Sequence, residues 1–185
     1  MKIAIFTGTF DPVHEGHAAF VQAAHRQIGF DEISVIAETK PRGKQTVTAL
    51  SHRATMLQLA FADNPNYHVV NITTDYARMP DTLDELKLGD AHVYLLLGTD
   101  VALKLKTWSN LDELIKRVIF VVGTRSDADA TRIHTLMAHL GVGIGGYMMI
   151  YTDHTKYSSS QVRTGTLAFH PKIINYIRKH HLYTL

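Results

Sequence analysis

The chain has 185 residues, of which 45% are hydrophobic and 19% charged, and its formal net charge of +2 is too small to indicate nucleic-acid binding. Its length suits a single domain over residues 1–185. The absence of cysteine excludes disulfide bonds and thiolate metal sites. No apolar run approaches the ~18 residues of a membrane span, and an apolar run follows Lys2 directly. We therefore expect a cytoplasmic protein with no signal peptide and no membrane contact.

Strand-like and helix-like segments alternate along the chain. The predicted strands cover residues 3–7, 32–38, 67–73, 93–97, 118–122 and 147–152. They are continuous apolar runs, which is typical of a parallel sheet covered on both faces. Helical spacing of apolar residues predicts helices at 18–28, 51–62, 110–116 and 129–140. The sequence therefore predicts an α/β fold: a Rossmann-like open, mostly parallel sheet in the order 3-2-1-4-5, with room for a sixth strand and helices on both faces.

Several residues mark predicted helix starts. Ser51 and Asn110 are expected N-caps, and Thr82-Leu-Asp-Glu85 fits a capping box that opens a short helix. Pro171 is expected at the first position of a terminal helix. The C-terminal helices from about residue 158 are assigned to the same domain.

The most informative stretch runs from Ile3 to His17. A short strand breaks at Gly8, and a helical pattern follows His17. A strand, a turn and a helix in this order create an anion site, because the first helical turn exposes N–H groups and carries the positive end of the dipole. His14 and His17 flank Gly16 at the mouth of that helix.

The pattern of this turn excludes three common sites. It has neither the G-x-G-x-x-G dinucleotide fingerprint nor the G-x-x-x-x-G-K-[ST] P-loop, and its histidines are three residues apart rather than four as in H-E-x-x-H. What remains, G-x-F-D-P-x-H-x-G-H, closely resembles the nucleotidyltransferase superfamily with the signature H-x-G-H. The resemblance implies transfer of a nucleoside monophosphate from a triphosphate to a phosphate or phosphonate acceptor, with release of pyrophosphate.

Ligands of open parallel sheets bind outside the carboxyl ends of the strands. We therefore expect the residues that follow the fourth strand to lie beside the histidine turn. Gly98-Thr-Asp100 follows the fourth strand. Asp100 can accept a hydrogen bond from a ribose hydroxyl or cap the next helix. The only tryptophan, Trp108, is expected to present a partly exposed ring that stacks on a planar heterocycle.

Residues 39–46 and 157–163 complete the candidate site. The first segment is basic and contains Pro41 and Gly43, so it is either a solvated loop or a cationic flap over phosphates. The second, Tyr157-Ser-Ser-Ser-Gln-Val-Arg163, combines serines at a helix start with a guanidinium that binds phosphate in a bidentate manner.

In order along the chain, these features are similar to those of the bacterial nicotinate-mononucleotide adenylyltransferase family. The resemblance includes Ser51-His-Arg53 with Met56-Leu57, and the final P-x-x-x-x-Y-I-x-x-x-x-L-Y. It implies Mg²⁺ carried by the ATP phosphates, with no metal ligands from the protein. The catalytic residues it implies are His14, His17 and Arg163. The ATP contacts are Gly8, Thr9, Phe10, Gly16, Gly98, Asp100, Ser158, Ser159 and Ser160, and the acceptor contacts are Thr7, Lys40, Thr82 and Trp108.

The sequence departs from that family at residues 76–83. The family has a Ser-Tyr-Thr segment whose backbone reads the nicotinate carboxylate; this chain keeps Thr82-Leu83 but has Tyr76-Ala-Arg-Met-Pro-Asp before it. The segment after Arg163 is also shorter. A pantetheine-phosphate adenylyltransferase, a cytidylyltransferase that uses CTP, and a nucleotide-binding regulatory module therefore stay open as alternatives. The expected partners are ATP and a mononucleotide acceptor, and homo-oligomerisation is left open.

Overall fold

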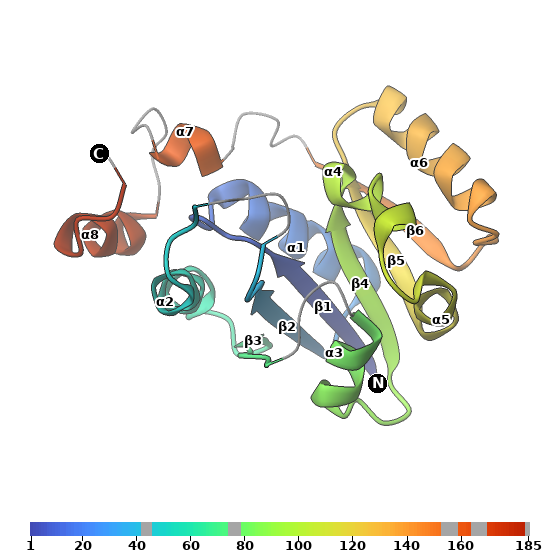
Figure 1. The fold of residues 1–185 in the computed structure, drawn as a ribbon, viewed down its shortest axis with the longest axis horizontal. Coiled ribbons are helices and arrows are strands. Elements are labelled where there is room, and N and C mark those ends of the chain that lie inside the picture. The colour runs from blue at the N-terminus through green and yellow to red at the C-terminus, as the bar shows by residue number, and fades with distance from the viewer. Residues whose placement is uncertain (42–45, 74–78, 153–158, 164–169, 184–185) are drawn as a thin grey trace.

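A computed structural model describes residues 1–41, 46–73, 79–152, 159–163 and 170–183, with the side chain of Val162 excepted. At its centre lies a six-stranded sheet in the order β3-β2-β1-β4-β5-β6, and every neighbouring pair of strands is parallel (Figure 1). The predicted order and the sixth strand are thus confirmed. The strands are β1 (Lys2–Gly8), β2 (Glu32–Ala37), β3 (Tyr67–Val69), β4 (His92–Gly98), β5 (Val118–Thr124) and β6 (Tyr147–Tyr151).

Helices bury both faces of the sheet, as the continuous apolar strands predict. One face is packed by α1 (Glu15–Ile28), α2 (Leu50–Phe61) and α8 (Pro171–Lys179), and α2 and α8 lie side by side (Figure 1). The other face is covered by α3 (Met79–Leu86), α4 (Thr99–Ala102), a 3-10 turn (Leu105–Thr107), α5 (Leu111–Arg117) and α6 (Asp127–His139). A short helix, α7 (Ser159–Arg163), precedes α8. Within the described ranges, no helix is both long and apolar enough to cross a membrane.

The predicted starts of α2 and α3 are wrong. α2 begins at Leu50 with Ala49 as its N-cap, so Ser51 is already a helical residue. α3 begins at Met79, three residues before Thr82, because Pro80 is well suited to a first helical turn. Thr82 is therefore inside the helix and fully buried, and the Glu85 carboxylate accepts a hydrogen bond from the Thr73 N–H (2.8 Å) instead of closing a capping box.

The strand order brings the two expected ligand-binding exits together. β1 pairs with β4, and Phe6 lies opposite Leu96. The histidine turn and the segment that begins at Gly98 are consequently neighbours, as predicted. The third strand ends at Val69, earlier than expected. Part of the predicted basic loop, residues 42–45, lies outside the described residues, and Lys40 is exposed beyond the end of β2.

Candidate active site

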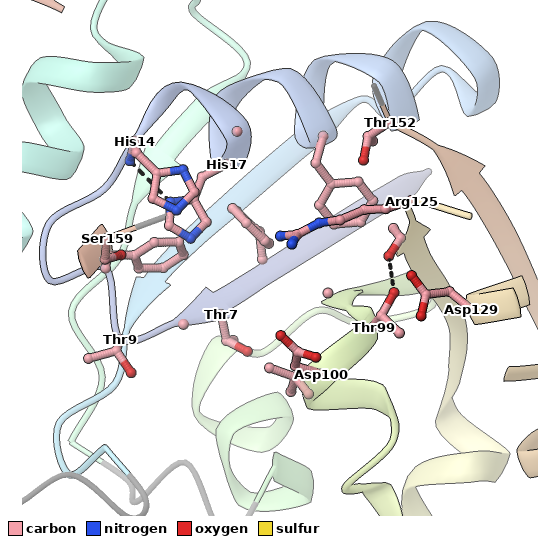
Figure 2. A pocket seen from close by; sticks show the side chains of 18 residues that line it. Thr7, Thr9, His14, His17, Thr99, Asp100, Arg125, Asp129, Thr152 and Ser159 are labelled. Carbon is pink, nitrogen blue, oxygen red and sulfur yellow. Dashed lines mark hydrogen bonds between the residues drawn. The ribbon is translucent and has the colours of Figure 1, made fainter. Parts of the chain in front are cut away.

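A cavity of about 340 Å³ opens at the carboxyl edge of the sheet (Figure 2). The exits of β1, β4 and β5 form its floor, and the first turn of α1, the α6 residue Asp129 and the α7 residue Ser159 complete its wall. Its volume falls within the range of small-molecule sites, roughly 300–1,000 Å³. The predicted site residues that line it are Thr7, Gly8, Thr9, Phe10, His14, Gly16, His17, Gly98, Asp100 and Ser159.

The two histidines form one unit at the start of α1. The helix begins at Glu15, and the prediction that it starts after His17 is wrong: His14 is the N-cap, with extended backbone, and His17 is the third helical residue. The His14 N–H donates to His17 Nδ1 at 3.1 Å, and the two rings stack with centroids 3.6 Å apart. Because Nδ1 accepts this bond, a neutral His17 ring carries its proton on Nε2, where it can donate to an anion.

Aromatic rings hold His17 in place from below. Phe10 meets the His17 ring edge to face at a centroid distance of 5.0 Å, and Phe6 lies 6.1 Å away. Phe10 adopts a left-handed backbone conformation (φ 49°), which folds its ring back over Gly8. A Cβ at Gly8 would lie 3.0 Å from that ring, so the turn needs glycine there for close packing.

Burial sets the charge of His14. Its side chain is 7% exposed, and its Nδ1 has no hydrogen-bond partner among the described residues. Burial, with a smaller contribution from the Arg125 guanidinium, lowers the pKa of His14 from 6.5 to about 4. The ring is therefore neutral at pH 7 in the absence of a bound anion.

Arg125 is a site residue that the sequence analysis missed. It directly follows β5, and its guanidinium extends across the cavity toward the two histidines (Figure 2). Asp129 and Thr152 line the same side of the cavity. One feature of the sequence could have identified Arg125. It is a cation directly after a buried strand, at the sheet edge where the histidine turn was expected.

The exits of β4 and β5 are fastened to each other beneath Arg125. Thr99 Oγ1 donates to the Gly123 carbonyl at 2.7 Å. A Cβ at Gly123 would lie 2.9 Å from the Phe20 ring of α1, so glycine lets the helix approach this strand closely. Asp100 is the second residue of α4, whose N-cap is Gly98, so the alternative of Asp100 as a cap is wrong. Its exposed carboxylate faces the cavity (Figure 2).

Arg53 connects three segments around the histidine turn. From the sequence, this residue was named only as part of the resemblance. Its side chain is 1% exposed and donates to the carbonyls of Thr9 (2.8 Å), Glu38 (2.9 Å) and Thr48 (2.8 Å). Burial lowers the pKa of its guanidinium, while the nearby carboxylates of Asp11 and Glu38 act in the opposite direction. Arg53 thus fixes the exits of β1 and β2 relative to the segment before α2.

The helix α7 is fastened to the histidine turn from a distant part of the sequence. Ser159 Oγ donates to the Pro12 carbonyl at 3.0 Å, and Arg163 Nη1 donates to the Asp11 carbonyl at 2.6 Å. Arg163 Nη2 also donates to Ser160 Oγ at 3.0 Å. Of the predicted phosphate-binding set, Ser159 lines the cavity, Arg163 and Ser160 do not, and Ser158 lies outside the described residues.

The predicted acceptor residues are more dispersed. Thr7 lines the cavity with a buried hydroxyl that has no partner among the described residues. Trp108 is 6% exposed and packs in the core with Leu105, so the expectation of a partly exposed ring is wrong. The 3-10 turn that precedes Trp108 directs its ring into the core. Trp108, buried Thr82 and exposed Lys40 do not line the cavity, and their roles stay predictions.

Comparison with known proteins places this geometry in a family. The family model described as Cytidylyltransferase-like matches residues 5–165. The chain belongs to this nucleotidyltransferase family. It is 32% identical to a probable nicotinate-nucleotide adenylyltransferase of Albidiferax ferrireducens, with 98% of both chains covered, and 29% identical to that of Desulfotalea psychrophila, with 98% of this chain and 99% of that one covered. The fold matches Plasmodium falciparum nicotinic acid mononucleotide adenylyltransferase complexed with NaAD (TM-score 0.74, 20% identity, coverage 98% and 97%).

The polar side chains of the cavity suit a nucleotide. Among the residues described, no group of three or more His, Asp or Glu side chains is placed to hold a metal. The cavity contains two carboxylates, Asp100 and Asp129, together with Arg125 and the histidine pair. Cationic and N–H donors match the phosphates of a nucleoside triphosphate, and the carboxylates match its ribose hydroxyls.

Proposed function

We propose that this nucleotidyltransferase transfers AMP from ATP to nicotinate mononucleotide, releasing pyrophosphate and forming the dinucleotide precursor of NAD. The observation that carries the proposal is the stacked His14–His17 pair at the N-terminus of α1, facing Arg125 across the cavity. Full-length similarity to relatives named nicotinate-nucleotide adenylyltransferase supports the substrate pair.

The reaction is an in-line displacement at the α-phosphorus of ATP. An oxygen of the acceptor phosphate forms the new P–O bond, and the bond between the α-phosphorus and the bridging oxygen breaks as pyrophosphate leaves. The attacking phosphate is already anionic, so the reaction needs no strong general base. Catalysis by this chain then consists of positioning the reactants and neutralising charge that grows on the phosphate oxygens.

The histidine pair supplies the charge neutralisation in this proposal. The His17 Nε2–H donates to a phosphate oxygen, and the N-terminus of α1 adds the positive end of the helix dipole. Neutral His14 takes up a proton more readily once an anion is bound, because the nearby negative charge raises its pKa. Removing one such donor typically costs about 2.7–4 kcal/mol of transition-state stabilisation.

Further side chains complete the proposed ATP site. Asp100 accepts from the ribose hydroxyls, and Arg125 binds the phosphates in addition to the predicted residues. Arg163, with Ser159 and Ser160, supports the outer phosphates from α7, where Arg163 already holds the Asp11 carbonyl. Mg²⁺ would arrive on the ATP phosphates, keep most of its waters and neutralise part of their charge.

The acceptor proposal is nicotinate mononucleotide, with Thr7, Lys40, Thr82 and Trp108 as the acceptor-side residues. Because the Ser-Tyr-Thr segment is absent, we expect a smaller preference for the acid over nicotinamide mononucleotide than the resemblance implies. The ratio of kcat/KM for the two acceptors, measured in the parent and in Trp108→Phe, tests this assignment. An unchanged ratio in the folded variant would mean that Trp108 has no acceptor role.

The experiment that tests the proposed function is a screen for pyrophosphate release. It crosses ATP and CTP with nicotinate mononucleotide, nicotinamide mononucleotide and phosphopantetheine. The proposal expects the highest kcat/KM with ATP and nicotinate mononucleotide. Turnover with phosphopantetheine alone, or with CTP alone, would keep the reaction class and reject the substrate. A protein that binds ATP but releases no pyrophosphate with any acceptor would be a regulatory module.

A further inference from the structure

We propose that Tyr183 is a positioning residue for the histidine turn, acting through the carboxylate of Asp11. The inference deepens the proposed function and rests on it. Tyr183 ends the motif P-x-x-x-x-Y-I-x-x-x-x-L-Y, which begins at Pro171 and has no part in the proposed chemistry.

The contact joins residues that are 172 positions apart. Tyr183 Oη donates to Asp11 Oδ1 at 2.7 Å, a charge-assisted bond in a site where Asp11 is only 5% exposed. Asp11 lies three residues before His14, in the turn that the resemblance assigns to phosphate binding. Burial raises the pKa of the Tyr183 hydroxyl, so it stays a proton donor to this carboxylate.

Asp11 is the point where several segments meet. Its carboxylate also accepts a bifurcated bond from the Thr48 N–H (3.3 and 3.4 Å), and its backbone carbonyl accepts from Arg163 (2.6 Å). The segment before α2, the helix α7 and the C-terminal segment therefore all fix one residue of the catalytic turn. Of these contacts, the Tyr183 bond is made by a single side-chain hydroxyl that a substitution can remove without changing the ring.

The backbone around Tyr183 indicates that its place is tightly determined. Tyr183 and His181 both have left-handed conformations, with φ of 60° and 51°. Such conformations are costly for bulky residues and persist only where surrounding contacts enforce them. Here the Leu182 N–H donates to the Ile177 carbonyl at 3.0 Å, and the side chains of Leu182 and Tyr183 pack against the core that α1, α2 and α8 share. The C-terminal segment thus returns from α8 to the turn at a fixed position.

The test compares Tyr183→Phe with a matched control, Tyr176→Phe. Both lose one phenolic hydroxyl from the C-terminal segment, but the Tyr176 hydroxyl bonds His52 (2.8 Å), away from the turn. In AMP transfer from ATP to nicotinate mononucleotide, Tyr183→Phe should lower kcat about tenfold with little change in the KM for ATP, because a misplaced turn costs rate more than binding. Tyr176→Phe should stay within about twofold of the parent. Equal kinetics for the two variants would overturn the inference.

Two further measurements distinguish a positioning role of Tyr183 from a purely structural one. One of them does not depend on the proposed substrate. In a double-mutant cycle, Asp11→Ala combined with Tyr183→Phe should lose no more activity than Asp11→Ala alone, whereas multiplying losses would show independent effects. Histidine imidazole NMR signals need no acceptor: Tyr183→Phe should shift those of His14 and His17, and Tyr176→Phe only those of His52 and His180. If nicotinate mononucleotide does not react in the parent, the proposed function fails, and the imidazole signals alone still decide for or against Tyr183.

Discussion

The backbone N–H of His14 donates to Nδ1 of His17 at 3.1 Å, and the two imidazole rings stack 3.6 Å apart at the first turn of α1. This relationship gives the two rings different chemistry. His17 keeps its proton on the nitrogen opposite the occupied Nδ1, and His14 is buried in its neutral form. The spacing of three residues places both rings on one face at the start of α1.

The first prediction concerns His17. His17→Ala should keep the fold and lower kcat by about 10²–10³, because it removes one donor aimed at the growing phosphate charge. The measurement is steady-state pyrophosphate release, with circular dichroism and the melting temperature as checks of folding. His139→Ala, at the exposed end of α6, is the control and should match the parent. Activity within a few-fold of the parent would make the histidine pair structural.

The second prediction concerns the pH dependence of stability. Because the pKa of His14 is lowered from 6.5 to about 4, the unfolded chain binds a proton between these values while the folded chain does not. The free energy of unfolding should therefore be highest above pH 6.5 and fall by roughly 3 kcal/mol toward pH 4 on account of this group. His14→Asn should remove this pH-dependent part of the free energy of unfolding. Denaturant titrations at several pH values measure it. An NMR titration that gives His14 an ordinary pKa would contradict the burial argument.

The third prediction concerns Arg163. Arg163→Ala should raise the KM for ATP and lower kcat, because it removes the guanidinium that we propose supports the outer phosphates and it releases the Asp11 carbonyl. Arg163→Lys should recover only part of the loss, since an ammonium lacks the planar fork. Arg117→Ala, which breaks ion pairs with Asp84 and Glu113 outside the cavity, serves as the control. Unchanged kinetics for Arg163→Ala would place this residue outside the reaction.

Much of the fold follows from local patterns. Continuous apolar runs at 93–97 and 118–122 predict buried parallel strands, and Gly29 and Pro171 lie at helix boundaries where the chain must change conformation. The predicted strand order placed the exits of β1 and β4 side by side. The sequence alone could therefore assign Asp100 and the histidine turn to one site.

The wrong predictions have tertiary causes. Trp108 lies in a polar sequence context, between Thr107 and Ser109, but the 3-10 turn before it directs the ring into the core. Thr82 fits a capping box by spacing, but the helix starts earlier at Met79. Arg125 went unnoticed because a single cation after a strand is common, and only the assembled sheet edge reveals what it faces.

The fourth prediction concerns packing beneath the site. Gly123→Ala should lower the free energy of unfolding by about 1–3 kcal/mol, because the new Cβ would lie 2.9 Å from the Phe20 ring. Phe20→Leu on the Gly123→Ala background should recover part of the loss by making room. Chemical denaturation of the parent, both single variants and the double variant measures the coupling. Additive effects would mean that the two residues do not compete for space.

The most direct test of the central claim is product formation from ATP and nicotinate mononucleotide. We predict that the chain forms nicotinic acid adenine dinucleotide and pyrophosphate in equal amounts, and that His17→Ala abolishes most of both while still folding. Chromatography of the dinucleotide alongside a pyrophosphate assay measures the two products in one reaction. No dinucleotide from the folded parent, with ATP and Mg²⁺ in excess, would contradict the account.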